Sequence, residues 1–378
     1  MNLPLKGLLV LEFSQYLAGP SAGLRLADLG ARVIKIERPK GGDACRQLAI
    51  KNLWADDGSS LLFHTINRNK ESVAADLKNP EDLAFIKQLI AKADVITHNF
   101  RPGVMDKVGL DYASVKALNP KLIYAEVSGY GKEGAWKNRP GQDLLLQSMT
   151  GLVHTTGNQD DNPMPFGIAV ADIICGTHLV QGILAALIRR HKRGVGALIE
   201  VSLMESVLDF QFELLTTYFA DKKNPTRSKI SNGHPLLAAP YGIYQTSNSH
   251  LAIAMVALDK LANSLQCEAL LAYSQEDAFT KRDEIKAHLA HFLQEKTTQE
   301  WLEILQKSGI WAIEVMNWQQ MKAHPAYQVL EMEQAIVTQN GQEIITTRCP
   351  IRINGERLRS SKSAPILGGD TQRIKEEL

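Results

Sequence analysis

Asp172 is the one carboxylate in an otherwise apolar and basic stretch, GIAVADIICGTHLVQGILAALIRRHKRG, residues 167–194. Apolar residues recur after it at helical spacing, and cations and a glycine close the stretch, as at a helix C-terminus. An aspartate at the start of a helix commonly caps it by accepting from the first free N–H groups. A carboxylate held there in apolar surroundings would instead stay charged and poorly solvated, which suits a nucleophile. The local sequence is compatible with both roles.

A second set of reactive side chains is basic. The set is Arg38, Lys40, Arg46, Arg68, Lys70 and Lys78. Most of these residues fall in loops near expected strand ends, where each one alone is compatible with solvated surface charge. Their clustering in a chain of net charge +1 is also compatible with a phosphate-bearing ligand. NFRPG, residues 99–103, directly follows an expected strand, so Asn99 and Phe100 could pair with and stack on a heterocycle, or form an ordinary turn.

Composition excludes several functional classes. With 42 basic and 41 acidic residues, the chain has no global field for nucleic acid or an anionic membrane. The four scattered cysteines indicate reduced thiols and a cytoplasmic protein, and the ten histidines show no metal-binding spacing. The apolar run 173–188 contains His178 and Gln181, which indicates a core helix and no membrane span.

The elements that must position these residues are those of an α/β fold. Residues 8–13, 31–37, 93–100 and 121–131 are predicted strands, and 22–30, 79–93 and 105–120 are predicted helices. The first two strands with the helix between them form a βαβ unit, which predicts a doubly wound parallel sheet resembling a Rossmann fold. A strand at 197–203 and a helix at 204–219 continue the pattern.

Two domains are expected. The large α/β domain is predicted over residues 1–224, and a polar stretch at 220–235 is interpreted as a linker. A smaller α+β domain is predicted over 225–325, with a hairpin at 241–256 and helices at 276–296 and 297–309. The tail, 326–378, is expected to pack back and complete the large domain.

A nicotinamide dinucleotide site is one alternative for the first βα turn, SQYLAGPSAG. This turn carries Gly19 and Gly23, and Glu37 ends the next strand, where a ribose partner would be expected. However, GxGxxG is absent and Pro20 lacks the backbone donor that a phosphate would need. The sequence therefore disfavours an oxidoreductase.

Five segments together resemble the family III CoA-transferases, which include formyl-CoA:oxalate and carnitine CoA-transferases and the related α-methylacyl-CoA racemases. The segments are LLVLEFSQYLAGPSAGLRLADLGARVIKIERPKGGDACR, NRNKESVAADLKNP, ADVITHNFRPGVMDKVGLDYASVKALNPKLIYAEVSGYG, GQDLLLQSMTGL and GIAVADIICGTHLVQGILAAL. The likeness runs from about Gly7 to SAPILGG near the C-terminus. It implies that Asp172 is the catalytic nucleophile, and that the protein is an intertwined homodimer with coenzyme A between a large and a small domain.

The resemblance also implies particular site residues. The implied coenzyme A contacts are Tyr16, Ala18, Arg38, Ala75, Lys78, Asn99, Phe100 and Lys107. Asp143 matches a second acidic residue near the nucleophile, which either tunes the charge of Asp172 or starts a helix. Gln142 stands where the racemases have a histidine. Leu17 replaces a glutamine of formyl-CoA transferase, and that enzyme's glycine-rich loop is not seen around AMVALDKLA, so the substrate cannot be carried over.

We therefore expect an acyl-CoA:carboxylate CoA-transferase that acts through an aspartyl anhydride and an aspartyl-CoA thioester. Its partners would be an acyl-CoA, a free carboxylic acid and a second copy of the chain, with no tightly bound cofactor and no metal. The alternatives are a racemase or isomerase on the same fold, a nicotinamide oxidoreductase, and a non-catalytic acyl-CoA-binding protein. Two-base racemisation needs a second proton carrier, and glutamine at position 142 cannot be one.

Overall fold

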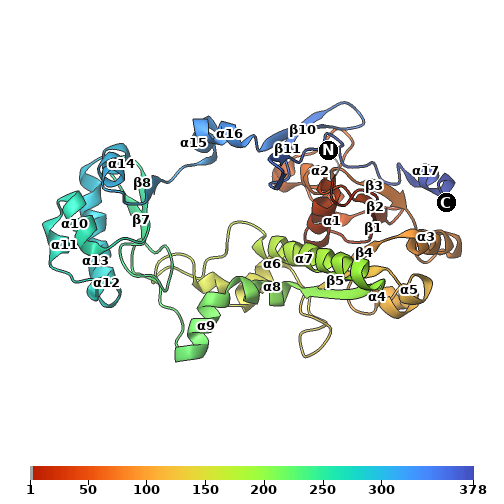
Figure 1. Ribbon diagram of the computed structural model, residues 1–378, viewed down its shortest axis with the longest axis horizontal. Helices are drawn as coiled ribbons and strands as arrows, with labels where there is room; N and C mark the ends of the chain where they lie inside the picture. The colour runs from red at the N-terminus through yellow and green to blue at the C-terminus, as the bar shows by residue number, and fades with distance from the viewer. Residues whose placement is uncertain (1–2) are drawn as a thin grey trace. The chain divides into compact units, whose positions relative to one another are not determined.

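The computed structural model describes residues 3–378, which divide into two compact units (Figure 1). Unit 1 runs to Leu146 and continues through Ala169–Phe210 and Val329–Leu378. Unit 2 comprises Gln147–Ile168 and Gln211–Gln328. Residues 147–168 and 211–224 thus belong to unit 2, although the sequence assigned them to the large domain. The chain passes between the units more often than a single linker would allow.

Unit 1 is built on a parallel sheet of six strands. The strands are β1 Leu9–Glu12, β2 Arg32–Glu37, β3 Glu71–Ala74, β4 Val95–His98, β5 Ile123–Ser128 and β6 Ala197–Ser202. Their order is β3-β2-β1-β4-β5-β6, and each neighbouring pair is parallel. The doubly wound order places the switch point between β1 and β4. The predicted strands are confirmed with trimmed ends, whereas the short β3 was not predicted.

Helices cover this sheet. They are α1 Ala18–Asp28, α2 Leu61–Asn67, α3 Pro80–Lys92, α4 Val104–Lys107, α5 Tyr112–Leu118, α7 Val170–Arg193 and α8 Leu203–Phe210, while α6 Asp143–Met149 begins in unit 1. The helices α1 and α8 pack against α7, and apolar residues of α3 and α5 join a core with alternate strand residues such as Leu11 and Ile96. The helix predicted at 105–120 is broken where Gly109 adopts a φ of +65° and Asp111 caps α5.

The helix α7 is long and apolar enough to cross a membrane by length and composition alone. It packs against α1, α8, β5 and β6 of unit 1, and residues such as Leu179 and Ile183 are fully buried there. These contacts are those of a core helix.

Unit 2 has its own apolar core around the buried Trp301. Its strands are β7 Gly242–Gln245, β8 His250–Ile253 and β9 Ala312–Glu314, which form an antiparallel sheet. Its helices are α9 Phe212–Asp221, α10 Leu258–Leu265, α11 Glu268–Leu271, α12 Asp277–Thr280, α13 Arg282–Phe292, α14 Thr298–Lys307, α15 Trp318–Ala323 and α16 Pro325–Leu330, the last of which crosses the unit boundary after Gln328. The predicted hairpin is confirmed as β7 and β8.

The segment interpreted as a linker is an ordered part of unit 2. The Arg227 guanidinium donates to the carbonyl oxygens of Thr156, Gln159 and Asp161, and the buried Lys286 donates to Ser228 Oγ and the Ser231 carbonyl. Cations that satisfy backbone carbonyls hold this polar stretch in place, which local composition does not reveal.

The tail returns to unit 1, as expected, and contains regular elements. It forms the hairpins β10 Glu333–Val337 with β11 Glu343–Thr347 and β12 Arg352–Ile353 with β13 Glu356–Arg357, and then α17 Thr371–Glu376. Asp370 Oδ2 accepts from Ser72 N at 2.9 Å, and Gly368 N donates to Ser72 Oγ at 2.9 Å. The tail therefore covers β3, the edge strand that would otherwise present unpaired backbone groups.

Candidate active site

The start of α7 carries Asp172, but Asp172 does not cap it. The N-cap position is Ala169, which makes no side-chain capping bond, and Asp172 is the third residue of the helix. Asp143, the first residue of α6, supplies the missing acceptor: its Oδ1 lies 2.7 Å from Ala171 N and 3.4 Å from Asp172 N. The interpretation of Asp172 as the helix cap is therefore wrong. The Asp172 carboxylate is not used to cap α7.

Close packing fixes where this end of α7 lies. A Cβ atom on Gly176 would sit 2.6 Å from the Ala18 carbonyl oxygen and 2.3 Å from Ser21 Oγ, so only glycine permits this approach to the start of α1. Residues four apart share one face of a helix, which places Asp172 on the face that Gly176 turns toward α1. The loop between β1 and α1 is thereby brought to the same end of α7 as Asp172.

The surroundings of Asp172 disfavour its charged form. Burial, and then the negative charge of Asp143, raise the pKa of Asp172 to about 6. At neutral pH the carboxylate is therefore mostly ionised but poorly solvated, and its basicity exceeds that of an exposed aspartate. A carboxylate in this state combines availability with nucleophilic strength.

The other implied contact residues follow the carboxyl ends of four adjacent strands. Tyr16 and Ala18 follow β1, Arg38 follows β2, Ala75 and Lys78 follow β3, and Asn99, Phe100 and Lys107 follow β4. Because the strands are parallel, these positions gather at one edge of the sheet, the edge where open α/β sheets bind ligands.

The exposed cations at this edge are fewer than the sequence suggested. Arg46 pairs with Glu37, Arg68 with Asp28 and Lys70 with Glu12, and all three cations are buried. These pairs do not face a ligand, so the clustering of basic residues in sequence was a misleading signal for them. Arg38, Lys40, Lys78 and Lys107 remain exposed, and Arg38 Nη2 donates to the Gly42 carbonyl at 3.2 Å.

Asn99 and Phe100 have structural partners. Asn99 Oδ1 accepts from Gln15 N at 2.8 Å, and its Nδ2 donates to Gln15 O at 2.6 Å, so its amide holds the β1 loop. The Phe100 ring stacks on His98 with centroids 6.0 Å apart.

Two further residues named from the resemblance are Ala75 and Gln142. The backbone N of Ala75 donates to the Glu37 carbonyl. Gln142 lies exposed, one residue before α6.

The features that suggested a dinucleotide have a different explanation. A Cβ on Gly19 would lie 2.2 Å from Ser14 Oγ, and one on Gly23 would lie 1.6 Å from Glu12 Oε2, so both glycines make room for side chains of β1 and its loop. Glu37 is buried and accepts from the Arg46 guanidinium, Ser72 Oγ and Asp43 N. Its carboxylate is fully occupied and cannot bind a ribose.

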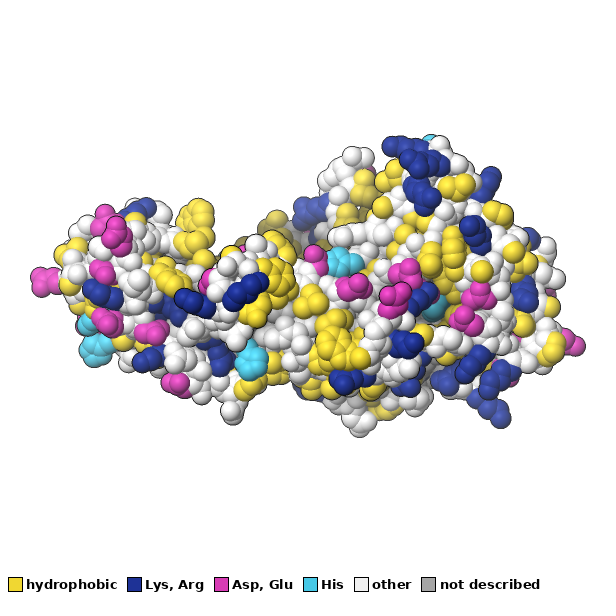
Figure 2. All heavy atoms as spheres, turned by 90° about the horizontal axis from the view of Figure 1, so that it is seen from below, with side chains coloured by type: hydrophobic (Ala, Val, Ile, Leu, Met, Phe, Trp, Pro, Cys, Tyr) yellow, Lys and Arg dark blue, Asp and Glu magenta, His cyan; other side chains and the backbone are white. Residues whose placement is uncertain are grey.

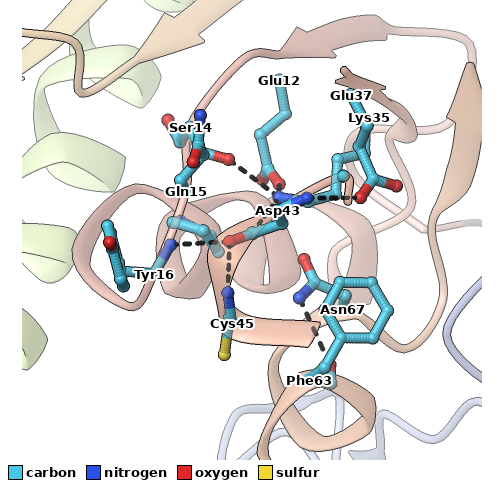
Figure 3. A network of polar contacts seen from close by, with 12 residues as sticks. Glu12, Ser14, Gln15, Tyr16, Lys35, Glu37, Asp43, Cys45, Phe63 and Asn67 are labelled. Atoms are coloured by element: carbon cyan, nitrogen blue, oxygen red, sulfur yellow. Dashed lines mark hydrogen bonds and ion pairs between the residues drawn. The ribbon is translucent and has the colours of Figure 1, made fainter. Parts of the chain in front are cut away.

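Sequence reasoning missed a buried polar network under this edge, which Figure 3 shows. Lys35 Nζ lies 3.0 Å from Glu12 Oε1 and 2.8 Å from Asp43 Oδ2, and Lys70 Nζ lies 2.9 Å from both oxygens of Glu12. Burial lowers the pKa of Lys70 to about 8, whereas the carboxylates of Glu12 and Asp43 overcome burial and raise that of Lys35. The available signal was a charged residue inside each of two apolar strands.

Among residues 3–378 no cluster of His, Cys, Asp or Glu could hold a metal ion.

Known proteins resemble this chain over nearly its whole length. The model of a family described as CoA-transferase family III matches residues 5–371. A succinate–glutarate CoA-transferase of Agrobacterium fabrum is 33% identical over 392 residues, covering 99% of this chain and 96% of that protein. An acetyl-CoA:oxalate CoA-transferase of Acetobacter aceti is 35% identical over 317 residues, covering 81% and 79%. The crystal structure of a CAIB/BAIF family protein from Brucella suis has a TM-score of 0.86 and 32% identity, and the match covers 100% of both chains.

We predict that Asp172→Asn stabilises the protein at neutral pH. A carboxyl whose pKa is raised on folding contributes stability below its unfolded pKa and loses it as the pH rises through the folded value of about 6. The variant should therefore gain about 1–3 kcal/mol at pH 7.5 and little at pH 4. Urea denaturation at both pH values measures this.

Asp111→Asn is the matched control. Hydrogen bonds from Ser114 lower the pKa of Asp111, so this substitution should destabilise the protein at neutral pH. An Asp172→Asn variant that is no more stable than the wild type at pH 7.5 would show that the folded site does not disfavour the carboxylate.

Proposed function

The chain belongs to CoA-transferase family III, and we propose that it moves coenzyme A from an acyl-CoA thioester to a free carboxylate through covalent intermediates on Asp172. One observation carries this proposal: a poorly solvated carboxylate with a pKa of about 6 stands at the start of α7, beside the acidic Asp143 that fixes that helix end. The relatives named above act on succinate and glutarate or on acetyl-CoA and oxalate, so we propose small mono- and dicarboxylates as the substrate class.

The proposed reaction begins when the Asp172 carboxylate attacks the thioester carbonyl carbon. The carbon–sulfur bond breaks, leaving an acyl-aspartyl anhydride and CoA thiolate. The thiolate then attacks the side-chain carbonyl of Asp172, which releases the donor as a free carboxylate and leaves an aspartyl-CoA thioester. The acceptor carboxylate attacks this thioester, which expels CoA thiolate and forms a second anhydride. The thiolate then attacks the acceptor acyl carbon of that anhydride, which gives the acceptor-CoA thioester and frees the Asp172 carboxylate. Each step conserves the activation of the acyl group.

Asp143 has two effects in this mechanism. Its hydrogen bonds to Ala171 N and Asp172 N fix the first turn of α7, and therefore the position from which Asp172 attacks. Its negative charge is a cause, after burial, of the raised pKa of Asp172, which makes that carboxylate a stronger base and nucleophile.

The racemase alternative needs a second proton carrier beside Asp172, and the nearby carboxylate of Asp143 is engaged by the first backbone N–H groups of α7. Gln142 cannot accept a proton at neutral pH. His178 lies six residues after Asp172, about 9 Å further along α7 and on another face. Its ring nitrogens face Ser206 Oγ at 3.1 Å and Asp209 Oδ2 at 3.3 Å. These contacts support a single-carboxylate mechanism.

We predict that Asp172→Ala lowers CoA transfer at least about 10³-fold, because the covalent route loses its nucleophile. The assay supplies succinyl-CoA or acetyl-CoA as donor and glutarate or oxalate as acceptor, and follows the new thioester by chromatography. Asp111→Ala, which removes a carboxylate that caps α5, should retain activity.

A parallel incubation in heavy water distinguishes the racemase. Rapid deuteration at the α-carbon of a 2-methylacyl-CoA, without CoA transfer to any acid in the panel, would contradict the proposed function. Full transfer by Asp172→Ala would contradict the mechanism alone.

We predict that Asp143→Asn moves the acid limb of the kcat/KM profile to lower pH. Asparagine can still accept from Ala171 N, but its neutral side chain no longer raises the pKa of Asp172. The limb, near pH 6 in the wild type, should shift by roughly half a unit to one unit, because burial still acts. Asp111→Asn should leave the profile in place, and an unshifted limb in Asp143→Asn would remove its electrostatic role.

We also propose a homodimer. Large apolar side chains are exposed in both units, among them Ile188, Phe212, Trp311 and Trp318. Figure 2 shows hydrophobic side chains exposed in patches between charged ones. Such surface favours a stable partner, and the resemblance makes a second copy the candidate.

We predict that sedimentation equilibrium gives twice the chain mass of 41.8 kDa at micromolar concentration. Trp311→Asp, on the exposed side of unit 2, should weaken association because a charge cannot be buried unpaired. An active, fully folded monomer would contradict the dimer.

A further inference from the structure

The loop between β1 and α1 contains a residue in an unusual backbone conformation. Tyr16 has a φ of +64°, in the left-handed region that bulky side chains rarely adopt. Such a conformation persists only where the surrounding structure holds it, and it often occurs at ligand sites. The contacts that hold Tyr16 therefore bear on what this loop binds.

Two side chains hold this loop from neighbouring strand ends. Asn99, after β4, bonds to both backbone groups of Gln15. Asp43, in the loop after β2, accepts from Tyr16 N through Oδ1 at 3.1 Å. Figure 3 shows the Tyr16 ring extending away from Asp43 while its backbone N faces it. The backbone is held by these bonds, and the residue as a whole is 56% exposed.

Asp43 is itself fixed on all sides. It is buried, and its Oδ1 also accepts from Cys45 N as the cap of a short 3₁₀ helix, Ala44–Gln47. Its backbone N donates to Glu37 Oε2 at 2.9 Å, and its Oδ2 lies 2.8 Å from Lys35 Nζ. A side chain with this many partners has one orientation, so it can impose a conformation on Tyr16.

Lys35 links the same carboxylate to the rest of the loop. Its ammonium donates to the Ser14 carbonyl at 2.8 Å and to Glu12 Oε1 at 3.0 Å. Ser14 is thus held by Lys35 of β2. Gln15 is held by Asn99, and Tyr16 is held by Asp43. The Lys35 ammonium therefore binds the first residue of the segment 14–16, and the Asp43 carboxylate binds the last.

We propose that Asp43 is a positioning residue for coenzyme binding: it holds Tyr16 in the left-handed conformation that presents the Tyr16 ring and the start of α1 to the coenzyme. This inference rests on the proposed coenzyme A site at this sheet edge. Without Asp43, residue 16 relaxes toward negative φ and the ring moves. Affinity for coenzyme A falls, while the reaction at Asp172 proceeds once substrate is bound.

The test compares coenzyme A binding by titration calorimetry in wild type, Asp43→Asn and Asp43→Ala. The asparagine variant would keep an acceptor for Tyr16 N but lose the charge facing Lys35, whereas the alanine variant loses both. We expect Kd to rise about threefold in Asp43→Asn and about tenfold or more in Asp43→Ala, with kcat changed less than about threefold. Asp111→Ala, which loses a cap of similar kind on α5, should leave Kd unchanged.

A second background tests the conformational role itself. Glycine adopts positive φ without strain, so in a Tyr16→Gly background Asp43→Ala should weaken coenzyme A binding less than about threefold further. Equal losses in both backgrounds would overturn the inference, as would an unchanged Kd in Asp43→Ala. If Asp43→Ala does not fold, Asp43→Asn decides, and an unchanged Kd there overturns the inference. A wild-type protein that does not bind coenzyme A would instead overturn the proposed function.

Discussion

The hydrogen bonds between the Asp143 carboxylate and the first turn of α7 are the contact on which this site depends. They satisfy backbone donors that Ala169, at the N-cap, leaves unsatisfied, and they free Asp172 from capping. They also place a second negative charge close to Asp172, where burial already disfavours ionisation. The same contact thus fixes the position of the proposed nucleophile and adds to the effect of burial on its basicity.

The sheet edge is divided between buried charges and exposed ones. The buried cations there are paired with carboxylates, because an isolated buried charge is costly. These ion pairs hold loops in place and are not available to a ligand. Lys35 and Lys70 converge on Glu12, and Gly23 leaves the space that this carboxylate requires. Exposed cations such as Arg38 are the candidates for binding the phosphates of the proposed coenzyme. The ion-pair partner and the burial of each cation therefore distinguish structural cations from candidate binding residues. The position of a cation in the sequence does not make this distinction.

The fold class could be predicted from the sequence, but several contacts of the site could not. Strand periodicity and the βαβ pattern predicted the parallel sheet, and the apolar period predicted α7 and the place of Asp172 near its start. The cap of α7 comes from Asp143, far away in the chain, and Asn99 uses its amide on Gln15. Such long-range pairings leave no local pattern. The sequence also did not predict that the chain crosses twice into unit 2. The polar segment around Arg227 has the composition of a linker, but Arg227 holds it in place through long-range bonds such as that to the Thr156 carbonyl.

The central claim is that Asp172 becomes covalently acylated, and peptide mass spectrometry after trapping tests it most directly. The enzyme is incubated with a donor thioester that it turns over, without acceptor, and hydroxylamine is added to intercept an anhydride or thioester on a carboxylate. We predict a hydroxamate on Asp172 that forms with donor and is absent when donor is omitted. A hydroxamate on another carboxylate, or none on Asp172 in an enzyme preparation that transfers CoA when acceptor is supplied, would contradict it.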